Sequence, residues 1–282
     1  MSATPPAAGA DPLVERLRAI GREAPQLAEA ARVYEVVLPL LRDADLGVPV
    51  PVLTAEAARA KLSRGEPLLQ GLDLGLDVEA VLPLLLQLAR ALEQPGNAAQ
   101  RIRIALAERD LDVASLLPHA AAGIREPLDT AARQLALDPD LLWTLAQCAL
   151  KPALWAWRQR LAPVAAGMTW DSASCFVCGA RAALAELRGS ARARHLRCTR
   201  CGADWRVSRL RCPHCGTEDH TAQRLLTAEG RRRTERVEAC DRCRGYVKAI
   251  DAFDATPPEM LAAEDLATLY LDAIARRSGY TG

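Results

Sequence analysis

Four short motifs decide the fold of this 282-residue chain: Cys175-Phe176-Val177-Cys178, Cys198-Thr199-Arg200-Cys201, Cys212-Pro213-His214-Cys215 and Cys240-Asp241-Arg242-Cys243. They contain eight of the nine cysteines, all within residues 175–243. Two Cys-x-x-Cys pairs supply the four thiolates that a tetrahedral metal ion prefers. The sequence therefore predicts two four-cysteine metal sites, whereas a single Cys-x-x-Cys pair would not distinguish a metal site from a redox site.

The distances between the pairs indicate which pairs share a site. The first two pairs are separated by 19 residues and the last two by 24 residues. Either length suits a β-hairpin between the two halves of a rubredoxin-like site, which favours sequential pairing. Site A would contain Cys175, Cys178, Cys198 and Cys201, and site B would contain Cys212, Cys215, Cys240 and Cys243. A cross-braced pairing, first with third and second with fourth, and a nested pairing remain open.

A glycine follows three of the four pairs, at Gly179, Gly202 and Gly216. A glycine suits the tight turn beneath a metal ion, where a Cβ atom would obstruct the backbone. The fourth pair is less regular, because Arg244 comes before Gly245.

Four thiolates make a closed site, which suits a structural or electron-transfer role better than catalysis. Zinc and iron both accept tetrahedral sulfur, so the spacing does not choose between them. The main alternative is a thiol redox or sulfur-transfer enzyme, but a redox Cys-x-x-Cys is normally single and lies at a helix N-terminus. We expect no catalytic residues, no other bound cofactor, and solvent or supporting roles for His195, His214 and His220. Cys148 is expected to be a buried core residue.

The composition is that of a globular protein: 50% hydrophobic, 25% charged, with a net charge of +1. Neither a signal peptide nor an apolar run of about 20 residues is visible, so we expect no membrane insertion. Unpaired thiols in such a chain indicate a reducing compartment, and we expect a cytoplasmic location.

Residues 181–250 contain 17 Arg or Lys and 8 Asp or Glu, a net charge of +9. A zinc-ribbon protein that binds nucleic acid would use such a surface, with Trp205 or Tyr246 stacking on bases. The alternative is charge balance, because two divalent ions, each bound by four thiolates, leave a charge of −4 in total. We favour charge balance and do not expect nucleic acid as a partner; Arg231, Arg232 and Arg233 are expected at a solvated hairpin tip.

The chain is predicted to be an α+β protein with five parts. These are a disordered leader (1–10), an all-helical domain (11–166), two tandem rubredoxin-like, or zinc-ribbon, modules (167–210 and 211–256) and a C-terminal helix (257–282). Hydrophobic residues at helical spacing support the helical domain over 26–44, 78–93, 98–109 and from 138 onward. Short alternating segments predict strands at 204–207, 236–239 and 246–250.

Three features carry a resemblance to a known family: the four Cys-x-x-Cys pairs with Trp205 and Arg209 between the second and third, Cys240–Lys248 (CDRCRGYVK), and Ala263–Asp272 (AEDLATLYLD). In these the chain resembles the formate dehydrogenase accessory protein family, FdhE. A weaker match is Lys61–Leu69 (KLSRGEPLL) in the helical half. One departure is Glu264-Asp265, where the family pattern has two aspartates.

The resemblance implies a cytoplasmic assembly factor that catalyses no reaction. Its partner would be the catalytic subunit of a molybdenum-containing respiratory formate dehydrogenase before export. The resemblance also implies that the two four-cysteine sites are rubredoxin-like and hold iron, although zinc suits the same ligands.

Overall fold

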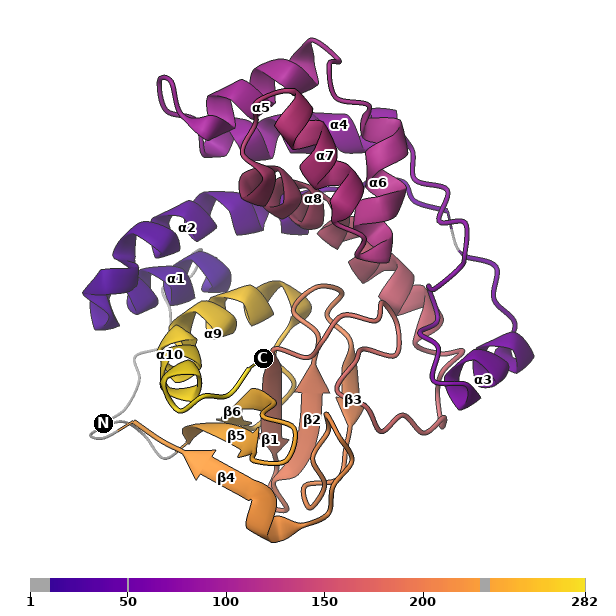
Figure 1. Cartoon of the computed structure of the whole chain (residues 1–282), viewed down its shortest axis with the longest axis vertical. Coiled ribbons are helices and arrows are strands. Elements are labelled where there is room, and N and C mark those ends of the chain that lie inside the picture. Colours follow the sequence, from indigo (N-terminus) through magenta and orange to yellow (C-terminus); the bar gives the residue numbers. More distant parts are fainter. Residues whose placement is uncertain (1–10, 50, 229–233, 282) are drawn as a thin grey trace.

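The computed structural model describes residues 11–49, 51–228 and 234–281. A helical domain packs against one mixed β-sheet, and two further helices lie between them (Figure 1). This is the α+β architecture that the sequence predicts. The predicted leader, residues 1–10, and the arginine run 231–233 lie outside the described residues.

The helical domain contains α1 (Pro12–Glu23), α2 (Ala28–Asp43), α3 (Ala55–Ser63), α4 (Val78–Ala91), α5 (Ala98–Ala107), α6 (Val113–Ala122), α7 (Glu126–Gln134) and α8 (Pro139–Leu161), with a 3-10 turn at Pro25–Leu27. Six of these helices begin at a side chain that accepts a backbone N–H, as Asp138 does for Leu141 at 2.9 Å. The core is mainly leucine and alanine, and the buried face of α8 runs through its centre. Two short helices, α6 and α7, were not identified individually from the sequence, although they lie within the region predicted to be helical.

The sheet contains β1 (Leu184–Arg188), β2 (Ala193–Arg197), β3 (Asp204–Arg206), β4 (Gln223–Leu226), β5 (Glu235–Cys240) and β6 (Tyr246–Ala252). Their order in the sheet is β3-β2-β1-β6-β5-β4. All pairs are antiparallel except β1 and β6, which run parallel with Leu184 opposite Lys248. The strands of the two predicted modules therefore join one sheet.

The hairpins lie where the cysteine spacing predicts them. The β1–β2 hairpin fills the 178–198 interval, and the β4–β5 hairpin fills the 215–240 interval. The strands predicted at 204–207, 236–239 and 246–250 correspond to β3, β5 and β6. Strands β1, β2 and β4 were not identified from the sequence.

The predicted single C-terminal helix is wrong in one respect: it is two helices. After a 3-10 turn at Pro258–Met260, α9 spans Leu261–Ala267 and α10 spans Leu269–Arg277. The buried Thr268 separates them, and its hydroxyl donates to the carbonyl of Glu264 at 2.8 Å. A threonine hydroxyl that bonds back to a preceding carbonyl bends or ends a helix.

The break allows the two segments to pack on different partners. Helix α9 contacts α1 and α2, while α10 lies on β5 and β6 (Figure 1). Within the part of the chain that the structure describes, no helix combines the length and the apolar character needed to cross a membrane.

Candidate metal centres

All four Cys-x-x-Cys motifs fold into the same turn, here called a knuckle. In each knuckle the fourth residue after the first cysteine donates its N–H to that cysteine's carbonyl. The N···O distances are 2.9, 2.8, 2.9 and 2.8 Å for Gly179, Gly202, Gly216 and Arg244. These four residues have φ between 59° and 75°, the left-handed region that glycine adopts at little cost. The glycine pattern seen in the sequence is thus a backbone requirement.

The fourth knuckle meets this requirement with an arginine. Arg244 has φ 59°, a conformation that costs a non-glycine residue about 1–2 kcal/mol. Its side chain bonds to the chain after α10: the guanidinium donates to the carbonyls of Ser278 at 2.9 Å and Gly279 at 3.1 Å. The carbonyl of Arg244 accepts the N–H of Thr281 at 2.7 Å. This irregular knuckle is therefore where the end of α10 attaches.

The thiols of the first two knuckles form one cluster, which we call site A. The sulfurs of Cys175 and Cys201 are 3.5 Å apart, and those of Cys178 and Cys198 are 3.6 Å apart. A tetrahedral ion with metal–sulfur bonds of about 2.3 Å places its ligands about 3.8 Å apart. The N–H of Val177 also points at the sulfur of Cys175 at 3.4 Å, as expected around a thiolate. The cluster therefore fits a tetrahedral ion.

Site B contains the thiols of the last two knuckles. Its sulfur–sulfur distances are 3.8 Å for Cys212 to Cys243 and 3.8 Å for Cys215 to Cys240. In both clusters all four sulfurs lie within 4.8 Å of one another. Among the described residues, the structure thus groups the cysteines sequentially and not in the cross-braced or nested arrangement.

The two sites differ in exposure. In site A, Cys175, Cys198 and Cys201 are fully buried, whereas in site B Cys215 is exposed and Cys243 is half-buried. Burial raises the pKa of the Cys175 and Cys201 thiols, and burial also raises the pKa of Cys212 to about 12. Thiols with raised pKa values keep their protons until a metal ion displaces them, so binding would release protons.

Site A lies at the junction between the sheet and the helical domain. The N–H groups of Leu68 and Leu69 donate to the carbonyls of Phe176 and Val177, at 2.8 and 2.9 Å, in the first knuckle. In the second knuckle, Lys151 of α8 donates to the carbonyl of Thr199 at 2.9 Å. The segment Lys61–Leu69, which carried the weaker resemblance, therefore contacts the first knuckle of site A through Leu68 and Leu69.

Arg200 strengthens the same junction. Its guanidinium donates to the side chain of Gln147 at 2.8 Å and to the carbonyls of Ala120 and Ala121 at 2.7 and 2.8 Å. A residue between two cysteines of site A thus satisfies the carbonyls at the end of α6. Sequence reasoning did not find this role, because nothing around Arg200 distinguishes it from the other arginines.

Most of the basic residues in the strands of the sheet form ion pairs with carboxylates of the same chain. Arg197 and Glu186 are both buried and lie 2.6 Å apart, and Arg194 pairs with Glu238 at 3.0 Å. Lys248, only 2% exposed, lies 2.8 Å from Asp272 of α10. These three basic side chains therefore have roles inside the fold, whereas others in residues 181–250, such as Arg206 and Arg209, are exposed.

The other candidate residues lie outside both clusters. His195 bonds to Asp204 at 2.8 Å, His214 bonds to the carbonyl of Tyr246 at 3.1 Å, and His220 is exposed. Burial lowers the pKa of His214. Cys148 was expected to be a buried core residue; it is only half-buried, but it packs against the core, and burial raises its pKa.

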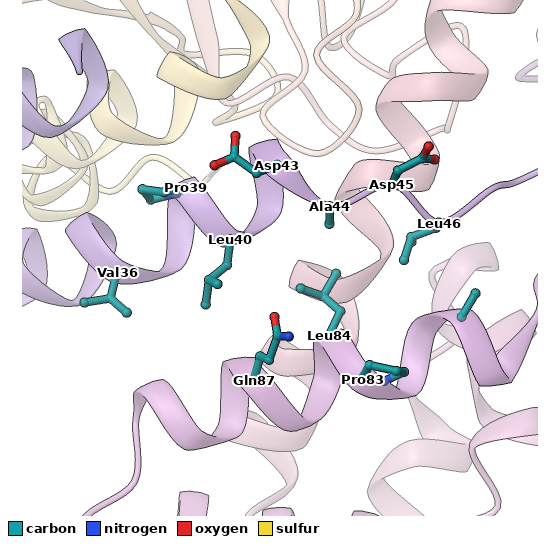
Figure 2. A pocket seen from close by; sticks show the side chains of 11 residues that line it. Val36, Pro39, Leu40, Asp43, Ala44, Asp45, Leu46, Pro83, Leu84 and Gln87 are labelled. Carbon is teal, nitrogen blue, oxygen red and sulfur yellow. The ribbon is translucent and has the colours of Figure 1, made fainter. Parts of the chain in front are cut away.

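A hollow lies between α2 and α4 (Figure 2). Its volume is about 440 Å³, and its walls are mostly apolar side chains such as Leu40 and Leu84. The two carboxylates at its rim are already engaged: Asp43 accepts from Arg42 at 2.8 Å, and Asp45 accepts the N–H of Gly47 at 3.0 Å. Asp43 and Asp45 are the ionisable residues of the described lining, which contains no histidine, cysteine, serine, threonine or lysine.

Comparisons with known proteins agree with this architecture. Residues 210–282 match the family model described as "FdhE, C-terminal domain". Over 108 and 109 residues the chain is 32% and 33% identical to proteins named "Protein FdhE homolog" from Shewanella sp. (strain MR-4) and Shewanella baltica (strain OS185). Each match covers 38% of this chain and 35% of the relative, so the sequence match spans about a third of each relative's length.

A solved structure is similar over nearly the whole chain. The crystal structure of the FdhE protein from Pseudomonas aeruginosa superposes with a TM-score of 0.61 at 25% identity, covering 95% of this chain and 91% of the other. The helical domain, the shared sheet and the two four-cysteine clusters define a protein with two zinc-ribbon-like modules that could hold two metal ions. Residues 210–282 therefore match the C-terminal domain of FdhE proteins, and the fold of the whole chain is similar to that of an FdhE protein.

Proposed function

We propose that this chain is a cytoplasmic accessory protein that binds the catalytic subunit of a formate dehydrogenase during maturation, before export. In this proposal each four-cysteine site holds one metal ion, iron or zinc, through all four thiolates. The protein catalyses no reaction itself; the metal ions stabilise the surface that the partner contacts. We further propose the division into leader, helical domain, two modules and C-terminal segment given above.

The observation that carries this proposal is the pair of closed clusters in a chain that resembles FdhE proteins along most of its length. Four protein ligands occupy every position of a tetrahedral ion and leave none for a substrate. Site A is also built into the junction between the helical domain and the sheet. Metal binding at site A would therefore stabilise both halves together, as a scaffold for a partner requires.

The nucleic-acid alternative is less well supported. Trp205, which would have stacked on bases, is buried and donates its indole N–H to the carbonyl of Ser172 at 3.0 Å. Tyr246 is also buried and donates to Asp272 at 2.7 Å. A gel-shift titration at low salt tests this alternative, and we expect no binding.

The thiol-enzyme alternative predicts a cysteine pair at the N-terminus of a helix. All four knuckles are instead turns next to strands or loops. Replacing one cysteine by alanine separates the two alternatives. For a metal scaffold, the change releases metal and lowers the melting temperature, whereas for an enzyme it abolishes turnover and leaves the fold intact.

Partner binding is tested by anaerobic co-expression of the tagged chain with a formate dehydrogenase catalytic subunit that lacks its export signal. We expect the tagged chain to recover the subunit after affinity purification, and to recover no exported molybdoenzyme of another class. If folded, metal-loaded protein fails to recover the subunit, the proposed partner is wrong.

Metal content is tested on anaerobically purified protein. We expect two metal ions per chain by elemental analysis, with a visible spectrum if the ion is ferric iron and none if it is zinc. A stoichiometry near zero in folded protein would contradict the proposed metal sites.

A further inference from the structure

Strand β3 forms one edge of the sheet, and its outward-facing main-chain groups can be identified. The carbonyl of Ala203 accepts from the N–H of Cys198 at 3.0 Å, and the N–H of Val207 donates to the carbonyl of Arg194 at 3.0 Å. The main-chain groups of both residues therefore point toward β2, and so do those of Trp205 between them, because directions alternate along a strand. The N–H and C=O groups of Asp204 and Arg206 consequently face away from β2. In the described part of the chain, the sheet has no strand on that side of β3.

A hollow of about 880 Å³ lies beside β3. Its apolar lining combines the loop after α8, the first knuckle and β3, through Met168, Trp170, Phe176, Trp205 and Val207. The rings of Phe176 and Trp205 meet edge to face, with centroids 6.1 Å apart, so this part of the lining is rigid. The volume lies in the range typical of ligand sites.

Two arginines that line this hollow, Arg206 and Arg209, have no carboxylate partner in the described part of the chain. Asp171 pairs with Arg211, and Asp204 pairs with Arg188 at 2.6 Å and with His195 at 2.8 Å. Arg206 is exposed, and no carboxylate in the described part of the chain lies within ion-pair distance of its guanidinium. The rim of the hollow therefore offers an unpaired positive charge next to the free strand edge.

We propose that β3 and this hollow form a docking groove for an extended peptide segment of a partner protein. The segment adds a strand to the sheet by bonding to the main-chain groups of Asp204 and Arg206, the mode called β-augmentation. Alternate side chains of an added strand point to opposite faces. Apolar residues of the segment enter the hollow, and the residues between them include an acidic one that pairs with Arg206.

Because β3 is short, main-chain bonds alone would bind such a segment weakly, so the apolar lining supplies much of the affinity. A short edge strand also limits non-specific pairing with other chains. The groove therefore favours segments that alternate apolar and acidic residues over amphipathic helices, and it does so whichever protein supplies the segment.

The opposite edge of the sheet provides a matched control. The carbonyl of Ala222 accepts from the N–H of Asp241 at 2.7 Å, so by the same alternation Leu225 of β4 points its main-chain N–H away from β5. Arg206→Pro and Leu225→Pro therefore each remove one outward N–H from an edge strand, where proline is tolerated. Only Arg206→Pro alters the proposed groove.

The probe is a phage-displayed library of random octapeptides, selected on the immobilised, metal-loaded chain. We expect enrichment of peptides that alternate apolar and acidic residues. Labelled copies of these peptides should lose about tenfold in affinity or more with Arg206→Pro, which removes a hydrogen bond and an ion pair and blocks the edge. They should bind Leu225→Pro like wild type. Arg206→Glu, which keeps the N–H, should weaken acidic peptides and favour basic ones.

The proposal would be overturned if the library gave no enriched peptides, or if it gave amphipathic helical ones. It would also be overturned if both proline variants lost the same affinity for the selected peptides, or if Arg206→Glu bound them as wild type does. Circular dichroism and metal content check that each variant folds, and Arg206→Glu decides the question if Arg206→Pro does not fold. Sedimentation of the free protein checks a further outcome, because a dimer that Arg206→Pro dissociates would show a second copy on this edge instead. None of these measurements uses a formate dehydrogenase subunit, so their failure is distinct from failure of the proposed function.

Discussion

The guanidinium carbon of Arg244 lies 4.2 Å from the centre of the Tyr280 ring. This contact joins the strained position of the fourth knuckle to the residues that follow α10. The hydroxyl of Tyr280 donates in turn to Asp241 of the same knuckle at 2.6 Å. One side chain thus links site B to the C-terminal helices, and it lies at a position where the other three knuckles have glycine.

Two substitutions separate the backbone strain at Arg244 from the contacts that its side chain makes. Arg244→Ala keeps a non-glycine residue at φ 59° and removes the stacking and the hydrogen bonds, so we expect a loss of about 1–3 kcal/mol in the free energy of unfolding. Arg244→Gly loses the same contacts but relieves about 1 kcal/mol of backbone strain. Guanidinium denaturation of metal-loaded protein should rank the variants wild type, glycine, alanine. An alanine variant as stable as the glycine variant would refute the strain argument.

Gly202 and Gly216 form a matched pair for testing how closely the turn before α9 packs on site A. Their φ angles are 73° and 72°, so alanine adds similar backbone strain at either position. A Cβ on Gly202 would lie 2.5 Å from the Cβ of Pro258, whereas one on Gly216 would meet only the flexible end of Arg211 at 2.9 Å. We expect Gly202→Ala to lower stability by about 1–3 kcal/mol more than Gly216→Ala, because a proline ring yields less easily. Similar melting temperatures for the two variants would contradict this account.

The difference in exposure between the sites predicts the order of metal release. Cys215 is exposed, while Cys175, Cys198 and Cys201 are fully buried, so a chelator reaches site B first. Zinc-loaded protein mixed with a chromogenic chelator should release metal in two phases of equal amplitude. Cys215→Ser should remove the fast phase and leave the slow one. A single phase, or a fast phase that persists in this variant, would be inconsistent with the structure.

Lys248 of β6 holds both C-terminal helices to the sheet. Its ammonium lies 2.5 Å from Asp265 of α9 and 2.8 Å from Asp272 of α10. Lys248→Met leaves Asp272 partly buried without its cation, so we expect a loss of about 3–5 kcal/mol in the free energy of unfolding. Adding Asp272→Asn to this variant should recover part of the loss. Urea denaturation of both variants checks the prediction, and additive losses would show that the two residues act independently.

Stability should fall at high pH partly through Tyr246. Burial and its hydrogen bond to Asp272 raise the pKa of Tyr246 to about 12, compared with about 10 in an unfolded chain. Between these values the unfolded chain releases a proton that the folded protein retains, so stability decreases as pH rises through this window and is unaffected below it. Tyr246→Phe should reduce the slope of stability against pH above about pH 10. An unchanged slope would exclude this contribution.

The sequence was most informative where the chemistry is local. The spacing of the cysteines predicted the sequential clusters and both hairpins, because a metal ion requires its ligands at fixed separations. The shared sheet was not predictable, since it depends on β1 meeting β6 across a long interval of sequence. Strand β1 is buried on both faces, so Leu184–Leu187 lacks the alternation by which exposed strands are recognised.

The features that sequence reasoning missed depend on tertiary contacts. Thr268 breaks a segment whose hydrophobic spacing is continuous, and the break is favourable only because α9 and α10 pack on different surfaces. Arg200 and Arg244 resemble the neighbouring surface arginines in sequence but donate to specific carbonyls in the fold. Helices α6 and α7 are short, and Pro118 within α6 obscures its periodicity.

The parallel pairing of β1 with β6 has a consequence for biosynthesis. All four cysteines of site A have been synthesised once the ribosome passes residue 201, but Leu184 pairs with Lys248. Until that later strand emerges, β1 presents an open edge on which a nascent chain can aggregate. Such long-range pairing also slows folding. The first module therefore completes its fold only after the second has been translated, so a chain truncated between the modules should remain aggregation-prone even with its first metal ion in place.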